Sequence, residues 1–156
     1  MTTLARVVCD SPQLEPFTPY DIPGKPWGRE QVIAATGRYT GKVLYRYARS
    51  HRGGLQYHAH KDEAFHLVSG TCRVYGVDPD GQPYALDMVP GMSFHVPPGA
   101  IHSVEAVTDC IFFEVSTPHF NDRVRVEHQY DLTNLRASVA APGGNGPDND
   151  NDDHQS

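Results

Sequence analysis

Short runs of apolar residues, or of alternating apolar and polar residues, recur along the middle of the chain, which is typical of β-strands. The runs occupy residues 31–35, 42–50, 55–60, 64–68, 71–77, 84–88, 93–96, 102–107 and 110–115. Turn signals such as Ser69-Gly70 and Pro90-Gly91 separate them. Only residues 119–137 leave room for a helical turn or two. The pattern predicts an all-β protein, built as an antiparallel sandwich or barrel.

The two ends of the chain differ from this strand-rich region. Residues 11–28 contain five prolines, so they form neither a regular helix nor a central strand, and we expect an extended arm. No apolar periodicity follows Val139, and the acidic end of the chain is predicted to be disordered. The predicted organisation is a Pro-rich arm at 1–28, a barrel at 29–140 and a disordered acidic tail at 141–156.

Composition narrows the class of protein. A chain of 156 residues suits one domain. No stretch approaches the roughly 18 consecutive apolar residues of a membrane helix, and residues 1–10 lack the apolar region of a secretory signal. We therefore expect a cytoplasmic protein with no membrane partner. The net charge of −6, without a basic block, argues against a nucleic-acid partner. Three widely separated cysteines argue against a disulfide framework.

Nine histidines are the feature of the composition that points to chemistry. His58 and His60 are two apart on a predicted strand, so both side chains leave the same face, about 6.5–7 Å apart. Nitrogens at that spacing can converge on one cation through bonds of about 2.0–2.2 Å. Glu63 can join them only if residues 61–62 form a bulge or a tight turn. His102, after a Pro-Pro-Gly turn, could supply a third imidazole from a distant strand.

Two motifs around these histidines resemble those of the cupin superfamily. The first, G-x5-H-x-H-x3,4-E-x6-G, appears as GGLQYHAHKDEAFHLVSG, with two residues instead of three or four between His60 and Glu63. The second, G-x5-P-x-G-x2-H-x3-N, appears as GMSFHVPPGAIHSVEA and fits from Gly91 to His102, with Ala106 in place of the final Asn. The resemblance implies a small double-stranded β-helix, a jelly-roll-like cupin barrel with a metal ion in its mouth.

The cupin resemblance also implies a set of metal ligands. The residues that match the family pattern are His58, His60, Glu63 and His102. Three imidazoles and one carboxylate suit one divalent ion of Fe, Mn, Ni, Co or Zn, and the ligand types alone do not choose among them. Four protein ligands leave two positions of an octahedral ion open to water and a chelating substrate.

A narrower resemblance covers residues 25–131 and concerns the cupin domain of type II phosphomannose isomerases. It rests on KPWGREQVIA, on SHRGGLQYHAHKDEAFHLVSGT and on FFEVSTPHFNDRVRVEHQY. The isomerases share the short spacing between the histidines and the glutamate. Their Arg in the histidine stretch is replaced here by Lys61, and their terminal Tyr-Gly-Arg by Tyr130-Asp131-Leu132. Sugar-phosphate isomerisation is therefore not carried over to this chain.

Two further polar residues are candidates for catalysis. Gln56 has the same strand parity as His58, so it should point inward beside the metal. Glu114 lies in the apolar run CIFFEV, where an ionised carboxylate is costly unless it is paired. It is our candidate second carboxylate or general base, and the alternative is a structural ion pair with Arg73 or Arg46.

Three classes of function stay open at this point. The favoured one is a metal-dependent isomerase or epimerase acting on a polar, sugar-like or carbonyl substrate. The second is a redox cupin, such as a non-haem iron dioxygenase of a biosynthetic pathway. The third is a cupin that binds a small molecule without catalysis. We also expect a homodimer that pairs through the Pro-rich arm, with Phe17, Tyr20 and Trp27 as contacts; the alternative is that the arm closes its own barrel.

Overall fold

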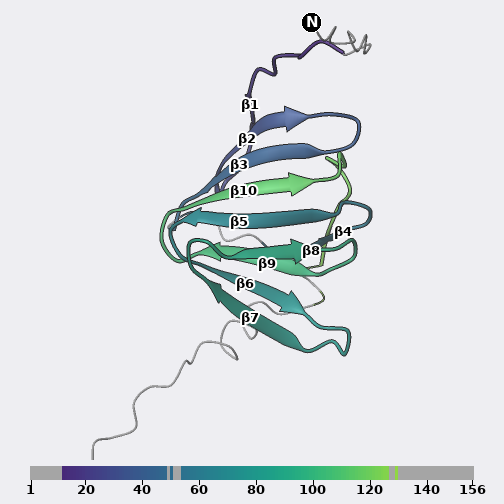
Figure 1. Cartoon of the computed structure of the whole chain (residues 1–156). Helices are drawn as coiled ribbons and strands as arrows, with labels where there is room; N and C mark the ends of the chain where they lie inside the picture. Colours follow the sequence, from purple (N-terminus) through teal and green to yellow (C-terminus); the bar gives the residue numbers. More distant parts are fainter. Residues whose placement is uncertain (1–11, 49, 51–53, 127–128, 130–156) are drawn as a thin grey trace, which may run out of the picture.

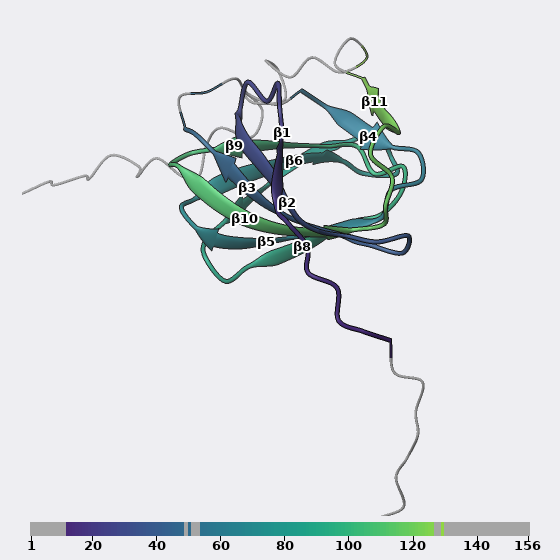
Figure 2. The same ribbon diagram turned by 90° about the horizontal axis from the view of Figure 1, so that it is seen from above.

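The protein is a barrel of two facing antiparallel sheets (Figures 1 and 2). The structure, a computed structural model, describes residues 12–48, 50, 54–126 and 129. Among these residues the regular secondary structure consists of strands alone, so the all-β prediction is confirmed. No helix in the described part of the chain is long and apolar enough to cross a membrane.

Each sheet combines strands that are far apart in the sequence. The first sheet has the order β1 (Tyr20–Ile22), β2 (Gly28–Ala35), β3 (Thr40–Arg46), β10 (Cys110–Ser116), β5 (Glu63–Ser69) and β8 (Ser93–Val96). The second has the order β11 (Arg123–Arg125), β4 (Gln56–His58), β9 (His102–Ala106), β6 (Cys72–Val77) and β7 (Pro83–Met88). Every run predicted from the apolar pattern overlaps one of the strands β2 to β10.

Two short strands lie where the sequence did not predict them. β1 falls inside the Pro-rich arm and pairs only with β2, at the edge of its sheet, where flanking prolines are tolerated. β11 falls in the region where we expected a helical turn, and it pairs with β4 at the other sheet's edge. The acidic tail at 141–156 lies outside the described residues, and the three boundaries of the predicted organisation stay predictions.

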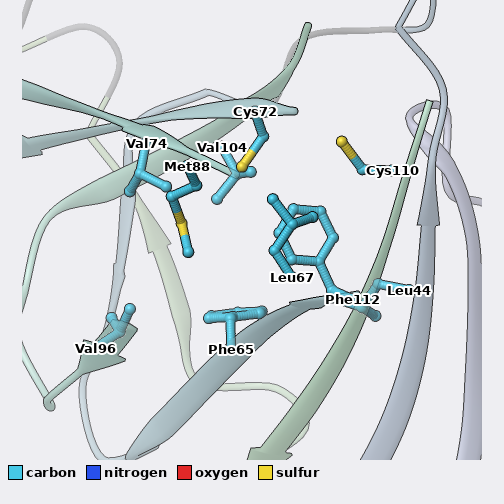
Figure 3. Packing of buried hydrophobic residues seen from close by; sticks show 10 residues of the cluster. All are labelled: Leu44, Phe65, Leu67, Cys72, Val74, Met88, Val96, Val104, Cys110 and Phe112. Carbon is cyan, nitrogen blue, oxygen red and sulfur yellow. The ribbon is translucent and has the colours of Figure 1, made fainter. Parts of the chain in front are cut away.

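The hydrophobic core fills the space between the sheets. Its side chains come from both sheets and point toward one another (Figure 3). Strict alternation decides which residues enter it: on β10 the Phe112 side chain is 1% exposed, whereas its neighbour Phe113 is 46% exposed. The cluster consists of Leu44, Phe65, Leu67, Cys72, Val74, Met88, Val96, Val104, Cys110 and Phe112.

The inward-facing positions change from apolar to polar along the strands. On β5 the inward series begins with Glu63 and continues with Phe65 and Leu67, all buried. β10 runs the other way, and its inward Glu114 lies opposite Lys42 of β3 and Phe65 of β5. The start of β5 and the end of β10 therefore place ionisable side chains at the same end of the barrel, while the core occupies the other end.

Two glycines in the turns position strands, one at each end of the barrel. Gly70 adopts φ of +83° between β5 and β6, and a Cβ there would collide with the backbone carbonyl of Asp109. Gly99, with φ of +85°, precedes β9, and its N–H donates to the carbonyl of His58 at 2.8 Å. This hydrogen bond ties the turn before His102 to the end of β4.

The alternation on β10 gives a matched pair of substitutions that tests the packing. Phe112→Ala should lower the free energy of unfolding by about 3–5 kcal/mol, because it leaves a cavity between the sheets. Phe113→Ala removes the same ring from the outer face and should cost less than about 1 kcal/mol. Urea unfolding followed by circular dichroism measures both. Equal losses for the two variants would contradict the assigned inner and outer faces.

Candidate metal centre

Three of the predicted ligands converge at the polar end of the barrel. His58 ends β4, Glu63 begins β5 and His102 begins β9. The Nε2 atom of His58 lies 3.6 Å from Oε1 of Glu63, and the Nε2 atom of His102 lies 3.5 Å from the same oxygen. Each of the three side chains offers a ligand atom within 4.8 Å of the other two.

The spacing of these atoms fits a metal ion. Bonds of about 2.0–2.2 Å around a tetrahedral or octahedral ion separate neighbouring ligand atoms by about 2.8–3.6 Å. Among the described residues, Glu63 Oε1 is a buried side-chain oxygen that has no hydrogen-bond partner. An unpartnered buried oxygen is unfavourable, and a cation shared with the two imidazoles would satisfy it. The residues therefore fit a divalent metal ion.

Hydrogen bonds on the far side of each imidazole orient it toward Glu63. His102 Nδ1 lies 3.0 Å from the carbonyl oxygen of Ala100, and His58 Nδ1 lies 3.0 Å from Oδ1 of Asp122. When both Nδ1–H groups donate to these oxygens, the Nε2 lone pairs face the centre of the site. This arrangement is the usual second layer around metal-binding histidines.

Asp122 orients the His58 ring and also holds the backbone of the turn that follows it. Its second oxygen, Oδ2, accepts the backbone N–H groups of His60 and Lys61, both at 2.7 Å. Burial raises the pKa of Asp122, but these backbone hydrogen bonds and the one to His58 outweigh it and hold the pKa at about 2. The carboxylate is therefore ionised at neutral pH, as an acceptor for a ligand histidine should be.

Burial sets the protonation of the two imidazoles. It lowers the pKa of His102 to about 4 and also lowers the pKa of His58, so both rings are neutral and able to bind metal at pH 7. Burial, followed by repulsion from Glu114, raises the pKa of Glu63. A metal ion at this position would favour the ionised form of that carboxylate.

The structure does not bring His60 to the other three residues. β4 ends at His58, and the chain turns at residues 59–60 because the N–H groups of His60 and Lys61 both bond Asp122. The His60 side chain is exposed, and its ring centroid lies 6.0 Å from that of His119. The inward position next to the metal centre is taken by Lys61, which is buried.

A continuous chain of ion pairs runs from the metal centre along the cavity wall. Its members, in spatial order, are Glu63, Lys61, Glu114, Lys42, Glu30 and Lys25. Lys61 Nζ bonds Oε2 of Glu63 and lies 2.6 Å from Oε1 of Glu114. The remaining ion pairs have N–O distances of 3.2, 2.8 and 2.6 Å. Positive and negative charges alternate throughout, so each buried charge has a partner of opposite sign.

The ion pairs favour the charged forms of Lys61 and Glu114. Burial lowers the pKa of Lys61, but Glu114 and Glu63 outweigh it and raise the pKa above its usual value. Burial raises the pKa of Glu114, but Lys61 and Lys42 outweigh it and lower the pKa. The ion pairs of Glu114 are thus made with lysines. Of the two cations named in the predicted alternative, Arg73 pairs with Asp87 at 2.6 Å, and Arg46 donates to the carbonyl of Val104 at 3.1 Å.

The metal centre and the ion pairs open onto one cavity of about 480 Å³. Gln56 lines it beside His58, as its parity predicted, and is paired in register with His102. Glu114 lines it as well, on the opposite sheet. Gln56 and Glu114 thus line the same cavity as His58, Glu63 and His102, and their catalytic role stays a prediction.

Three residues of the site were not identified from the sequence. Lys61 is two residues before Glu63 and Lys42 two before the core residue Leu44, so strand parity alone could have placed both side chains inside. Asp122 carries no comparable signal, because its contacts with His58 and Lys61 are more than 60 residues away in the sequence.

Comparisons with known proteins identify the family. Residues 43–119 match the model of the cupin domain. KdgF from Halomonas sp. has a similar structure, with a TM-score of 0.54 and 20% identity over 66% of this chain and 89% of that one. A comparison with curated proteins found no match. The chain belongs to the cupin superfamily, as its two motifs predicted, and its fold is a cupin barrel.

Larger cupin proteins share the fold over part of their length. Oxalate decarboxylase from Bacillus subtilis, an enzyme with Mn(II) centres, has a TM-score of 0.57 and 16% identity over 76% of this chain and 34% of that one. CapF, a capsular polysaccharide assembling protein from Staphylococcus aureus, has a TM-score of 0.59 and 17% identity over 70% and 34%. The matched region spans about a third of these two proteins.

Substitutions of the candidate ligands test the three-residue metal centre. His58→Ala or His102→Ala should lower bound metal at least about tenfold, because each removes one of three converging donors. His60→Ala should keep its metal, because the His60 ring lies outside the site. His66→Ala, on the outer face of β5, is the control. Elemental analysis of the purified variants measures the content. Metal loss in His60→Ala, or full occupancy in His58→Ala/His102→Ala, would contradict the three-residue site.

A substitution of Asp122 tests its role in orienting His58 for metal binding. Asp122→Asn keeps the size of the side chain but removes the charge that orients His58, so metal affinity should fall about 10–100-fold while the barrel stays folded. Competition with a chelator of known affinity measures this change. Asp87→Asn, which removes a carboxylate from the exposed pair with Arg73, is the matched control and should leave metal affinity unchanged.

Proposed function

We propose that this protein is a metal-dependent cupin enzyme that catalyses an isomerase- or epimerase-type proton transfer on a small polar carbonyl or sugar-like substrate. The observation that carries the proposal is the position of Glu63 Oε1 on the wall of a 480 Å³ cavity. This oxygen is buried between two imidazole Nε2 atoms and has no hydrogen bond from any residue that the structure describes. The site has room for a small molecule and a set of donors for an ion such as Mn, Fe, Ni, Co or Zn.

The residues around the ion suit a reaction that develops negative charge on oxygen. A bound divalent ion supplies Lewis acidity, which polarises a substrate carbonyl. The Lys61 ammonium group, held protonated beside Glu63, provides a second positive charge for a developing oxyanion. Gln56 has an amide group that can orient a substrate oxygen next to His58.

Glu114 is our candidate for the group that moves the proton. Its contacts with Lys61, Lys42 and Ser116 all involve Oε1, at 2.6, 3.2 and 3.3 Å. We assign Oε2, to which none of these three contacts is made, as the oxygen that accepts a substrate proton. The carboxylate is ionised at neutral pH and therefore able to act as a base.

A second candidate function follows from the number of ligands. With His60 outside the site, the converging donors are two histidines and one carboxylate. That combination is typical of non-haem Fe(II) oxygenases. A redox cupin, such as a dioxygenase, is therefore the alternative that the site supports.

One experiment separates these functions. Protein purified without oxygen is analysed for metal and then incubated in D₂O with a panel of small sugars and 2-oxo acids. We expect NMR to show deuterium entering the carbon next to the carbonyl, with no oxygen consumption. Stoichiometric iron with substrate-dependent oxygen uptake would establish the redox alternative. Bound metal with neither reaction, but with saturable ligand binding, would establish a binding protein.

The base assignment predicts the behaviour of Glu114→Gln. The substitution keeps the shape of the side chain but removes the proton acceptor, so turnover should fall by about 10²–10⁴ with metal content unchanged. The matched control is Glu30→Gln, which removes a carboxylate from the same chain of ion pairs without touching Lys61. Equal losses of turnover and stability in both variants would assign Glu114 a structural role only.

We also propose that the protein is a homodimer that pairs through its arm. Residues 12–19 are exposed, and the Leu14 and Phe17 side chains are 93% and 40% exposed, so this segment does not cover its own barrel. Figure 2 shows it leaving the barrel in an extended path. Light scattering at tens of micromolar should give twice the chain mass of 17.3 kDa. The monomer mass would contradict the proposal.

A further inference from the structure

The cations around the cavity fall into two groups. Three lysines, Lys25, Lys42 and Lys61, are each paired with a glutamate of the chain of ion pairs. Three arginines, Arg46, Arg123 and Arg125, line the same cavity. Among the described residues, no carboxylate forms an ion pair with any of these arginines. Among the lining residues the three glutamates balance the three lysines, so the arginines leave this lining with an excess of positive charge. The ionised Asp122, which lies outside the lining, offsets part of that excess.

Two of these arginines stand next to the candidate metal centre. β11 pairs antiparallel with β4, which sets Arg123 opposite His58 and Arg125 opposite Gln56. Side chains of directly opposed residues lie on the same face of a sheet. Both arginines therefore share the face of His58, and Val124 between them takes the other. Figure 2 shows β11 beside β4 at the rim of the barrel.

The chemistry of this pair matches an oxyanion. Residues two apart on a strand are about 6.5–7 Å apart at Cα, which lets two guanidinium groups approach one ligand. Each guanidinium is planar and offers paired N–H donors to a carboxylate or a phosphate. Arg123 and Arg125 are exposed, so their N–H groups are accessible from solvent at the mouth of the cavity.

We propose that Arg123 and Arg125 form an oxyanion site that anchors the carboxylate or phosphate of the substrate and directs its other end toward His58, Glu63 and His102. The inference rests on the proposed function and gives its substrate class: a small anionic molecule, such as a sugar acid or a sugar phosphate. The two arginines are specificity-determining residues, because they contact the anionic group at a distance from the reacting atoms.

The test uses a matched set of ligands and the single tryptophan of the chain. Trp27 lines the same cavity, with Arg46 stacked 4.3 Å from its ring centroid, so its fluorescence reports on ligands that enter. The purified, metal-analysed protein is titrated with glucuronate, glucose 6-phosphate and glucose. Calorimetry on the same samples detects binding that leaves the fluorescence unchanged. We expect at least one of the two anions to bind more tightly than glucose, and the tighter anion identifies the preferred group.

Variants then assign the binding to the two arginines. Arg123→Gln/Arg125→Gln should weaken anion binding roughly tenfold to a hundredfold, the cost of losing charge-assisted hydrogen bonds. Its metal content and melting temperature should stay unchanged, since both side chains are exposed. Arg123→Lys/Arg125→Lys should restore only part of the affinity. Arg38→Gln, in the exposed turn between β2 and β3, is the control and should bind as the wild type does.

Two results would overturn the proposal. One is a double Gln variant that binds both anions as tightly as the wild type. The other is a wild type that binds neither anion more tightly than glucose. Metal content, measured in the same samples, separates this failure from that of the proposed function. A protein that holds no metal contradicts the proposed function, whereas unchanged anion binding in a metal-loaded variant contradicts only the arginine site.

Discussion

The candidate metal centre depends on how the two oxygens of the buried Glu63 carboxylate are partnered. Lys61 satisfies one oxygen of Glu63, and the other faces two imidazoles without a hydrogen bond from the described part of the chain. If Lys61 were absent, both oxygens would be unpartnered in a buried position, which is more costly than one. The ammonium group thus lowers the cost of ionising the buried Glu63 and leaves its other oxygen available to a cation. The rest of the polar end follows from this requirement, since Lys61 itself needs the carboxylate of Glu114.

The chain of ion pairs is a consequence of burying the first charge. Each added partner neutralises the one before it, and the series ends at Lys25, which is partly exposed. Buried ion pairs contribute little net stability compared with well-packed apolar residues, because desolvation offsets most of their attraction. We therefore attribute the ion pairs to the burial of Glu63 at the candidate metal centre. The stability of the fold comes from the apolar cluster around Phe112.

The sequence predicts the fold well and the site in part, for different physical reasons. Strands β2 to β10 follow from local alternation and turn residues, which the sequence displays directly. The end of β4 does not follow from the local pattern. Alternation predicts that His60 lies on the same face as His58, but Asp122 accepts the N–H groups of His60 and Lys61, and the chain turns there. That contact joins residues more than 60 apart. The edge strands β1 and β11 are three residues each, too short for a pattern to emerge.

The position of Asp122 immediately before β11 has a thermodynamic consequence. The same short segment orients the His58 ring and carries the arginines opposite it. An anion bound by Arg123 and Arg125, as proposed, and a metal ion bound by His58 would restrain the same segment, so the entropy lost in ordering it would be lost once for two ligands. Metal and anion affinities are then linked, and reciprocity requires each ligand to strengthen the other by the same factor. If the proposed metal and anion sites are both filled, cooperativity between them arises from these four consecutive residues, without a movement of the barrel.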